Sequence, residues 1–301
     1  MKYLPFTLLI LAMSLVNCSD DDSTDFYNNT DYRNAYLNEY KEIFTIVNPS
    51  VKNEIISKKG VKIEFDKNTF LKENSLFTGN IRVEFLLIVD KSNMILSGLT
   101  TVLRSNSQLD ILKTGGEFYL NAFDAETNEK LTLSDDYLVS IPKALTEDDG
   151  STMLLFIGSG ENIQYWRWPL FQGDTSSVID ESDSAFNVIF SEFGWINCDA
   201  FALIDKPKFA IAFEFPDNFN DDNALTFISL DSLPFSMLNI YTPIPINENA
   251  KLIFITRTEN NYHVAFEEFV SQENVSIDFT DKELDVVPAD EIKNYLKNIV
   301  E

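Results

Sequence analysis

The chain of 301 residues is poor in the residue types that build most catalytic and metal sites. It has one histidine, His263, and two cysteines, Cys18 and Cys198. A multi-histidine metal site is therefore impossible, and so is a zinc site of four thiolates or of paired cysteines and histidines. A Ser-His-Asp triad would have to use His263, and no Gly-x-Ser-x-Gly turn is present. The sequence thus predicts no metal and no cofactor, and Cys198, in apolar surroundings, is expected to be a buried small hydrophobe.

Basic residues, glycine and proline are scarce as well. The chain has 23 Lys and Arg against 48 Asp and Glu, which gives a net charge of −25. Because nucleic-acid affinity comes from Lys and Arg that neutralise phosphates, this balance excludes most nucleic-acid partners. It also argues against docking on anionic lipid through a basic patch. With only 10 Gly and 10 Pro, the turns must rely on Asn and Asp.

The first 17 residues are typical of an export signal. Lys2 and the amino terminus precede a nearly unbroken apolar stretch over residues 3–16. At about 1.5 Å per residue this stretch spans about 21 Å, less than the roughly 30 Å hydrocarbon core, so a permanent membrane helix is not expected. Residues 18–30, which follow it, are expected to form a polar, acidic tether.

The segment Leu15-Val16-Asn17-Cys18 resembles the lipobox of bacterial lipoproteins, although Asn17 replaces the usual Gly, Ala or Ser. The acidic residues 20–22 that follow resemble the export tags of surface lipoproteins of the Bacteroidetes. The resemblance implies that Cys18 is acylated, with palmitate or a similar chain. It also implies a protein that is lipid-anchored at the bacterial outer membrane and exposed at the cell surface. The alternative is an ordinary signal peptide followed by a solvated charge run, with Cys18 incidental.

Apolar residues alternate with polar ones over much of the chain, which is 45% hydrophobic and contains 25 Phe. The longest alternation covers residues 81–89. Two more runs, at residues 252–254 and 262–266, flank a turn at residues 259–261, and this arrangement predicts a hairpin. Short alternating strands bounded by Asn, Asp and Gly turns are typical of antiparallel sandwiches.

Helical spacing occurs near the two ends. Five apolar residues are spaced by four, four, three and one positions, as on one face of a helix: Tyr32, Tyr36, Tyr40, Ile43 and Phe44. Pro288 with two acids begins a short amphipathic run. The sequence therefore predicts a mainly β protein with two antiparallel β-sandwich-like domains and a helix at each end. The expected segments are a signal peptide (1–17), a tether (18–30), an N-terminal helix (31–50), a β-sandwich domain (51–145), a second β-rich domain (146–287) and a C-terminal helix (288–301).

Residues 60–145 contain a series of motifs that resembles a known β-sandwich module, first described in zonula occludens proteins and netrin receptors. The closest resemblance is to its relatives in exported Bacteroidetes proteins, and residues 194–199, Gly-Trp-Ile-Asn-Cys-Asp, resemble a signature that follows the module there. The resemblance implies a fold and a lineage, and it carries no catalytic residue. The motifs, in order, are Gly60–Phe70, Thr78–Phe85, Leu96–Thr101, Thr114–Phe118 and Ile141-Pro142.

The densest aromatic segment contains Tyr165, Trp166 and Trp168. Aromatic faces can stack on the apolar surfaces of a sugar or peptide, so these residues are a candidate ligand platform. The alternative is that they pack within a strand or between the domains.

Three serines follow an aspartate in a pattern that resembles the acceptors of Bacteroidetes O-glycosylation. In this pattern Ser23, Ser184 and Ser232 are the candidate residues for O-glycosylation. Such tripeptides are common in any acidic sequence.

These observations predict a non-catalytic binding, adhesion or assembly protein. Its expected partners are the membrane, through the lipid anchor, and a surface glycan or another envelope protein. The alternative is a glycan-directed surface hydrolase with a pair of carboxylates in a cleft between the two domains. A deep cleft with convergent carboxylates would favour the hydrolase, whereas an exposed strand edge or aromatic patch would favour binding.

Overall fold

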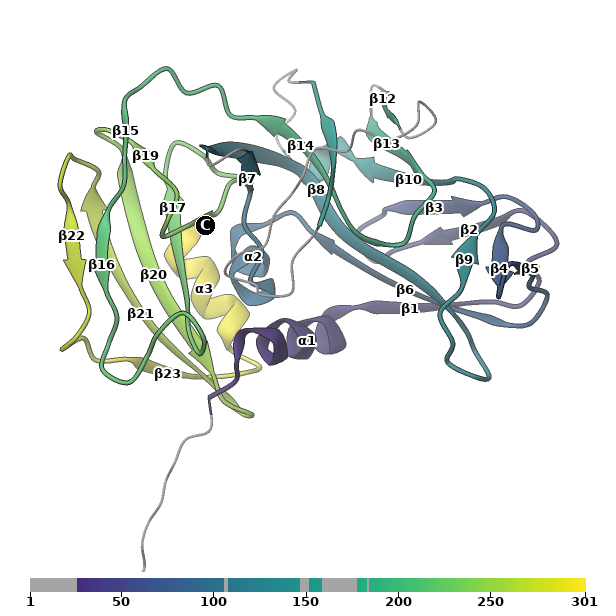
Figure 1. Cartoon of the computed structure of the whole chain (residues 1–301), viewed down its shortest axis with the longest axis horizontal. Coiled ribbons are helices and arrows are strands. Elements are labelled where there is room, and N and C mark those ends of the chain that lie inside the picture. Colours follow the sequence, from purple (N-terminus) through teal and green to yellow (C-terminus); the bar gives the residue numbers. More distant parts are fainter. Residues whose placement is uncertain (1–25, 106–107, 147–151, 159–177, 183) are drawn as a thin grey trace, which may run out of the picture.

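Strands dominate the computed structural model, which describes residues 26–105, 108–146, 152–158, 178–182 and 184–301 (Figure 1). Nearly all strand pairs are antiparallel. One helix precedes the first strand of the described chain, and another follows the last strand. The predicted fold class, mainly β with a helix near each end, is therefore confirmed.

Two sheets face each other in the first unit, which we call the sandwich. One sheet has the order β1-β6-β8-β14-β11, with β7 also paired to β8, and the other has the order β12-β13-β10-β3-β2. A small sheet of order β5-β4-β9 lies at one end (Figure 1). The strands are β1 (Glu42–Ile46), β2 (Asn53–Ile56), β3 (Lys62–Phe65), β4 (Phe70–Lys72), β5 (Ser75–Leu76), β6 (Ile81–Ile88), β7 (Val102–Ser105), β8 (Gln108–Asp124), β9 (Thr132–Leu133), β10 (Tyr137–Pro142), β11 (Leu154–Ile157), β12 (Val178–Glu181), β13 (Ala185–Phe190) and β14 (Gly194–Phe201).

The core of the sandwich is made by the inward-facing residues of both sheets. Val83 and Phe85 of β6 and Phe118 of β8 pack there against Phe65 of β3 and other residues of the second sheet, all without exposed surface. Because successive side chains of a strand point to opposite faces, the period of two over residues 81–89 places one apolar set in this core, as predicted. Cys198 is fully buried in the same core, also as predicted.

The second unit is built on a five-stranded sheet of order β18-β17-β20-β21-β23. The predicted hairpin across residues 259–261 is confirmed as the pair β20–β21, in which Arg257 lies opposite Tyr262. Two small sheets, β15-β19 and the parallel pair β16-β22, belong to this unit. The strands are β15 (Lys208–Phe209), β16 (Ala212–Glu214), β17 (Leu225–Leu230), β18 (Leu238–Asn239), β19 (Ile244–Pro245), β20 (Asn249–Arg257), β21 (Asn261–Val270), β22 (Ser276–Asp278) and β23 (Asp285–Pro288).

Three helices fill the space between the sandwich and the second unit (Figure 1). They are α1 (Asn29–Tyr40), α2 (Lys91–Ser97) and α3 (Ile292–Val300). Both faces of strand β20 are buried, because Leu252 and Phe254 pack on the small sheets whereas Ile253 and Ile255 pack on the helices. The helices therefore share one apolar cluster with the outer face of the first sandwich sheet and with the inner face of the second unit.

The N-terminal helix is shorter than the expected range 31–50. It ends at Tyr40, and residues 42–46 form strand β1, in which Phe44 and Ile46 pack on the sandwich core. Ile43, Thr45 and Ile46 are β-branched, and this favours a strand. Two of the apolar residues assigned to the helical face thus belong to an alternating strand.

The sandwich also extends beyond the expected boundary at residue 145. Strand β13 pairs with β10, and strand β14 pairs with β8, so both sheets are completed by residues 154–201. Periodicity indicates that a strand exists but not which strand it pairs with. A short helix, α2, was not predicted, although Asp90 caps it through the N–H of Asn93 (2.9 Å) and Gly98 ends it with a φ of 68°.

Candidate functional site

Most of the residues proposed as sites from the sequence lie outside the described residues. These are the lipidation residue Cys18, the O-glycosylation candidate Ser23 and the aromatic platform Tyr165, Trp166 and Trp168. They stay predictions.

Ser184 and Ser232 are both described and both exposed. Ser184 is in a bend before β13, and its carbonyl accepts a hydrogen bond from the N–H of Lys143. Ser232 is in the turn after β17, beside Glu248, with which its side chain forms a hydrogen bond. Their exposure is compatible with modification, which stays a prediction.

A buried polar cluster lies where β8 and β14 pair, on the face that meets the helices. Glu117 lies opposite Asn197, and the side-chain amide of Asn197 donates to Asp199 Oδ2 at 2.6 Å. All three side chains are without exposed surface. Their strands are the ones that carry residues 114–118 and 194–199, so a motif of the proposed module and the signature that follows the module lie on paired strands.

Burial controls the protonation of this cluster. It raises the pKa of Glu117, and the nearby carboxyl of Asp199 raises it further, while the guanidinium of Arg33 opposes the rise. Burial also raises the pKa of Asp199, against the hydrogen bonds that its carboxyl receives from Asn197 and Thr114. A pair of carboxyls with raised pKa values is a chemical arrangement that acid–base catalysis uses. Here neither carboxyl has surface that a substrate could reach.

The sequence contained a signal for this pair. Glu117 and Asp199 interrupt strands that are otherwise rich in apolar residues on both faces. No spacing rule, however, connects two residues that are 82 positions apart.

Two open pockets lie where the second unit meets the sandwich and the helices. One, of about 320 Å³, lies beside Lys113, Phe201 and Phe235. The other, of about 480 Å³, is lined by two lysines, three acids and apolar residues; the charged residues are Lys91, Lys251, Asp90, Asp231 and Glu301. The signs of its charges are mixed, so the second pocket has no clear preference for an anion or a cation.

Lys91 is buried beside the second pocket. Its ammonium group donates to Ser229 Oγ (2.8 Å) and to the carbonyl of Leu230 (2.9 Å). Burial lowers the pKa of Lys91 to about 8. These two hydrogen bonds tie α2 to β17, so the lysine has a structural role in joining the helices to the second unit.

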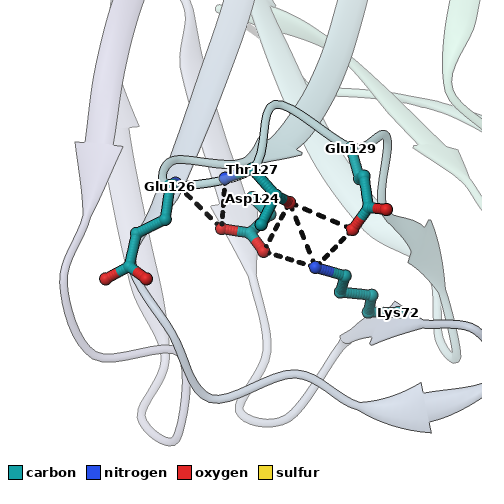
Figure 2. Close-up of polar contacts among 5 residues, drawn as sticks. All are labelled: Lys72, Asp124, Glu126, Thr127 and Glu129. Carbon is teal, nitrogen blue, oxygen red and sulfur yellow. Dashed lines mark hydrogen bonds and ion pairs between the residues drawn. The ribbon is translucent and has the colours of Figure 1, made fainter.

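Figure 2 shows a polar cluster at the turn after β8. Asp124 Oδ1 accepts the N–H groups of Glu126 (2.9 Å) and Thr127 (3.4 Å), and its Oδ2 accepts the ammonium of Lys72 (2.6 Å). Glu129 forms a second ion pair with Lys72. The cluster joins the turn to strand β4, and the carboxylate of Asp124, the ammonium of Lys72 and the hydroxyl of Thr127 all have protein partners, so it stabilises the turn.

The edge of the sandwich formed by β1 and β2 is open. We use the name open edge for these two strands with their connection, residues 42–58. In the described part of the chain, β1 pairs only with β6 and β2 pairs only with β3. The start of β1 lies close to the end of β2, because the carboxylate of Glu42 at the start of β1 accepts the N–H of Lys58 (2.9 Å), just after β2.

Exposed aliphatic side chains are concentrated on the open edge. Of the nine large hydrophobic residues that are exposed in the described residues, four lie within this short segment. They are Ile43 (58% exposed), Val47 (72%), Val51 (49%) and Ile56 (61%). Single exposed aliphatic residues are ordinary, but a concentration of such residues at strands with a free edge is typical of a surface that receives a partner.

The longer segment that contains the open edge differs in charge from the rest of the chain. Residues 41–72 carry seven lysines against four acids, a net charge of +3, which leaves −28 on the remainder. Counting charge along the chain could have found this contrast.

No arrangement for a metal or a membrane-spanning helix is found in the part of the chain that the structure describes. Its His, Cys, Asp and Glu side chains form no group of three or more that could hold a metal ion. None of its helices is long and apolar enough to cross a membrane. The one histidine, His263, is half-buried and packs edge-on against Phe26, with ring centres 5.1 Å apart.

No protein-family model matches the chain, and no curated protein matches it.

Proposed function

We propose that the protein is a lipid-anchored lipoprotein of the bacterial outer membrane that binds or assembles with a partner at the cell surface and catalyses no reaction. The observation that carries the proposal is the open edge, where two strands each have one unpaired side and where these strands and their connection expose Ile43, Val47, Val51 and Ile56. An unpaired strand offers backbone N–H and C=O groups to an added strand, and exposed aliphatic side chains add contact area.

The path of the N-terminal segment supports this proposal. The N–H of Tyr27 donates to the carbonyl of Arg257 (2.8 Å), and the ring of Phe26 packs on Phe219 and His263, so the chain leaves the second unit toward Cys18. The open edge begins at the other end of α1, about 18 Å away for a helix of 12 residues. The described chain therefore starts on the second unit, away from the open edge.

Panning of a displayed random-peptide library tests the proposal. The bait is the chain from residue 19 onward, which contains every described residue, and the comparison is the variant Ile43→Asp with Ile56→Asp. We expect the wild type to enrich peptides that the double variant does not bind. A matched control, Val270→Asp with Val286→Asp, changes two exposed aliphatic residues of the second unit and should bind as the wild type does. The proposal would be overturned if the enriched peptides bind both double variants equally, or if no peptide is enriched.

A glycan-directed hydrolase is the second candidate, and the buried carboxyls of Glu117 and Asp199 support it. Because both carboxyls are buried, a substrate could reach them only if the helices moved away from the sandwich. Incubation with a panel of polysaccharides and chromogenic glycosides tests this candidate. Turnover that is abolished by Glu117→Gln would favour the hydrolase over the binding protein.

A further inference from the structure

Lysines flank strand β2 of the open edge at both ends. Lys52 directly precedes the strand, and Lys58 follows it after Ser57. Lys67 lies at the same end as Lys52, because the N–H of Asn68 donates to the carbonyl of Pro49 (2.8 Å) and holds the two turns together. Strand β2 therefore has lysines at both ends.

These lysines are available to a partner. Lys58 and Lys67 are exposed, and no acid of the described residues forms an ion pair with either. Lys52 is 59% exposed and lies 3.4 Å from Glu64. An exposed ion pair of this kind contributes little to stability, so it does not prevent Lys52 from binding another carboxylate.

We propose that β2 receives, as an added strand, an extended peptide segment of a partner with acidic residues at both of its ends. This inference rests on the binding function proposed above and names the chemistry of the partner. Backbone hydrogen bonds along Asn53–Ile56 supply the pairing, the two lysine groups fix the ends, and Ile56 supplies an apolar contact.

The spacing of the acids follows from strand geometry. Lys52 and Lys58 are six residues apart, which is about 20 Å at roughly 3.3 Å per residue. The partner segment therefore has acids about six residues apart, with β-branched residues between them, because such residues suit a strand.

Other occupants fit the open edge less well. A second copy would bring another chain of charge −25, and antiparallel pairing of β2 with itself would place Lys52 opposite the Lys58 end of the other copy. Like charges in opposing positions destabilise a strand pair, and edge lysines are a common means of preventing self-pairing. Hydrocarbon is disfavoured because it leaves unpaired backbone groups without partners.

Three labelled peptides of equal length test the proposal by fluorescence polarisation against the chain from residue 19 onward. The first is Asp-Thr-Val-Thr-Val-Thr-Asp, the second has lysine in place of both aspartates, and the third has proline in place of the central threonine. We expect the first peptide to bind at least tenfold more tightly than the other two. We also expect its affinity to fall as salt is added, because salt screens exposed charges.

Two charge-reversal variants locate the site. Lys52→Glu with Lys58→Glu should weaken binding of the acidic peptide at least tenfold, whereas Lys208→Glu with Lys297→Glu, on the second unit and α3, should leave it unchanged. Amide hydrogen exchange in residues 51–58 should slow when the peptide binds, since added-strand hydrogen bonds protect the backbone. Protection elsewhere, or self-association of the chain through this edge, would overturn the proposal.

The outcomes separate this inference from the function on which it rests. If the lysine-ended peptide binds the open edge as well as the acidic one, the acidic partner is wrong and the binding function stands. If neither binds and library panning also recovers nothing that depends on Ile43 and Ile56, the binding function itself is wrong.

Discussion

Glu117 faces Asn197 across strands β8 and β14, and no donor of the described residues reaches either carboxyl oxygen of Glu117. One oxygen of Asp199 likewise has no partner, although the other accepts the Asn197 amide. A buried carboxylate without donors is costly, so such a group is held neutral by a raised pKa. The face of the sheet that meets the helices thus contains two acids that favour the protonated state.

The first prediction concerns stability against pH. Burial raises the pKa of Glu117 and brings the pKa of Asp199 to about 8. The unfolded chain ionises these acids near pH 4, whereas the folded chain holds them neutral. The contribution of the two acids to the free energy of unfolding is therefore fully present below about pH 4. It is lost as the pH rises toward 8, at up to about 1.4 kcal/mol per pH unit for each acid.

Substitution with the amides isolates this effect. Asp199→Asn and Glu117→Gln cannot ionise, so each should raise the free energy of unfolding at pH 8 relative to the wild type, with a smaller difference at pH 4. Urea unfolding at pH 4, 6 and 8 measures the free energy of unfolding of each variant and of the wild type. Asp281→Asn, at an exposed turn, is the control and should give the same difference at each pH. A wild-type stability that rises between pH 4 and 8 while the amide variants stay level would contradict the prediction.

The second prediction separates backbone strain from side-chain collision at two glycines. Gly116 has a φ of 138° and Gly194 a φ of 143°, both in a region that other residues rarely adopt. A Cβ at Gly116 would lie 2.9 Å from Ile141 Cδ1 in the sandwich core, whereas a Cβ at Gly194 would meet nothing within 4 Å. Gly194→Ala should cost about 1–3 kcal/mol from strain alone, and Gly116→Ala should cost more.

Chemical denaturation of the two variants measures these costs. The difference between them reports the collision with Ile141, because the φ angles of the two glycines, 138° and 143°, are nearly the same. The double variant Gly116→Ala with Ile141→Val should recover part of the loss only if the collision is real. Equal costs for the two alanine variants would show that strain alone explains both.

The fold class could be predicted from the sequence because it depends on local pattern. A period of two over residues 81–89 and an Asn-containing turn at residues 259–261 identify strands and a hairpin without knowledge of their neighbours. The sandwich boundary could not be predicted, since residues 185–201 return to pair with β10 and β8, and such pairing depends on contacts far apart in the sequence.

The candidate sites, like the fold, depend partly on local sequence and partly on long-range strand pairing. The open edge depends on which strands keep a free edge, and that is a property of the whole topology. The lysines around strand β2, Lys52, Lys58 and Lys67, are visible in the sequence, but their position around a single strand is not. The buried pair Glu117 and Asp199 also needed the strand register, which places Glu117 opposite Asn197.

The third prediction uses Asp124, whose pH dependence has the opposite sign to that of Asp199. The ammonium of Lys72 and the N–H groups of Glu126 and Thr127 hold the pKa of Asp124 well below its usual range (Figure 2). A group with a lowered pKa stabilises the fold above the pKa of the unfolded chain, near pH 4, and this stability is lost as the pH falls through the folded-state value. Asp124→Asn should therefore lower the melting temperature at pH 7 and have less effect at pH 3.

Thermal unfolding of Asp124→Asn at the two pH values tests the sign. Lys72→Met should show the same trend, because it removes the cation that Asp124 pairs with. The exposed acid Asp135 provides the control Asp135→Asn, which should leave the melting temperature nearly unchanged. A larger loss at pH 3 than at pH 7 would contradict the assignment of Asp124 as an ionised cap of this turn.

The last prediction concerns Arg257, which joins the N-terminal helix to the second unit. Its side chain is 3% exposed, forms an ion pair with Glu39 of α1, and donates from Nη1 to the hydroxyl of Tyr262 (2.7 Å). Its guanidinium also lies over the rings of Tyr27 and Tyr262. Arg257→Met keeps the apolar stem but removes every polar contact, so it should lower the free energy of unfolding by roughly 2–4 kcal/mol.

The control for Arg257 is an exposed ion pair of the same unit. Lys282 pairs with Glu267 at 2.8 Å, but both side chains are partly in solvent, so Lys282→Met should cost less than about 1 kcal/mol. Limited proteolysis adds a local measurement, because loss of the Arg257 contacts should free residues 26–40 from the second unit and make them the first segment cleaved. If Arg257→Met costs no more than Lys282→Met, and if residues 26–40 stay protected, then α1 is held by its apolar face, through Tyr32 and Tyr36, rather than by Arg257.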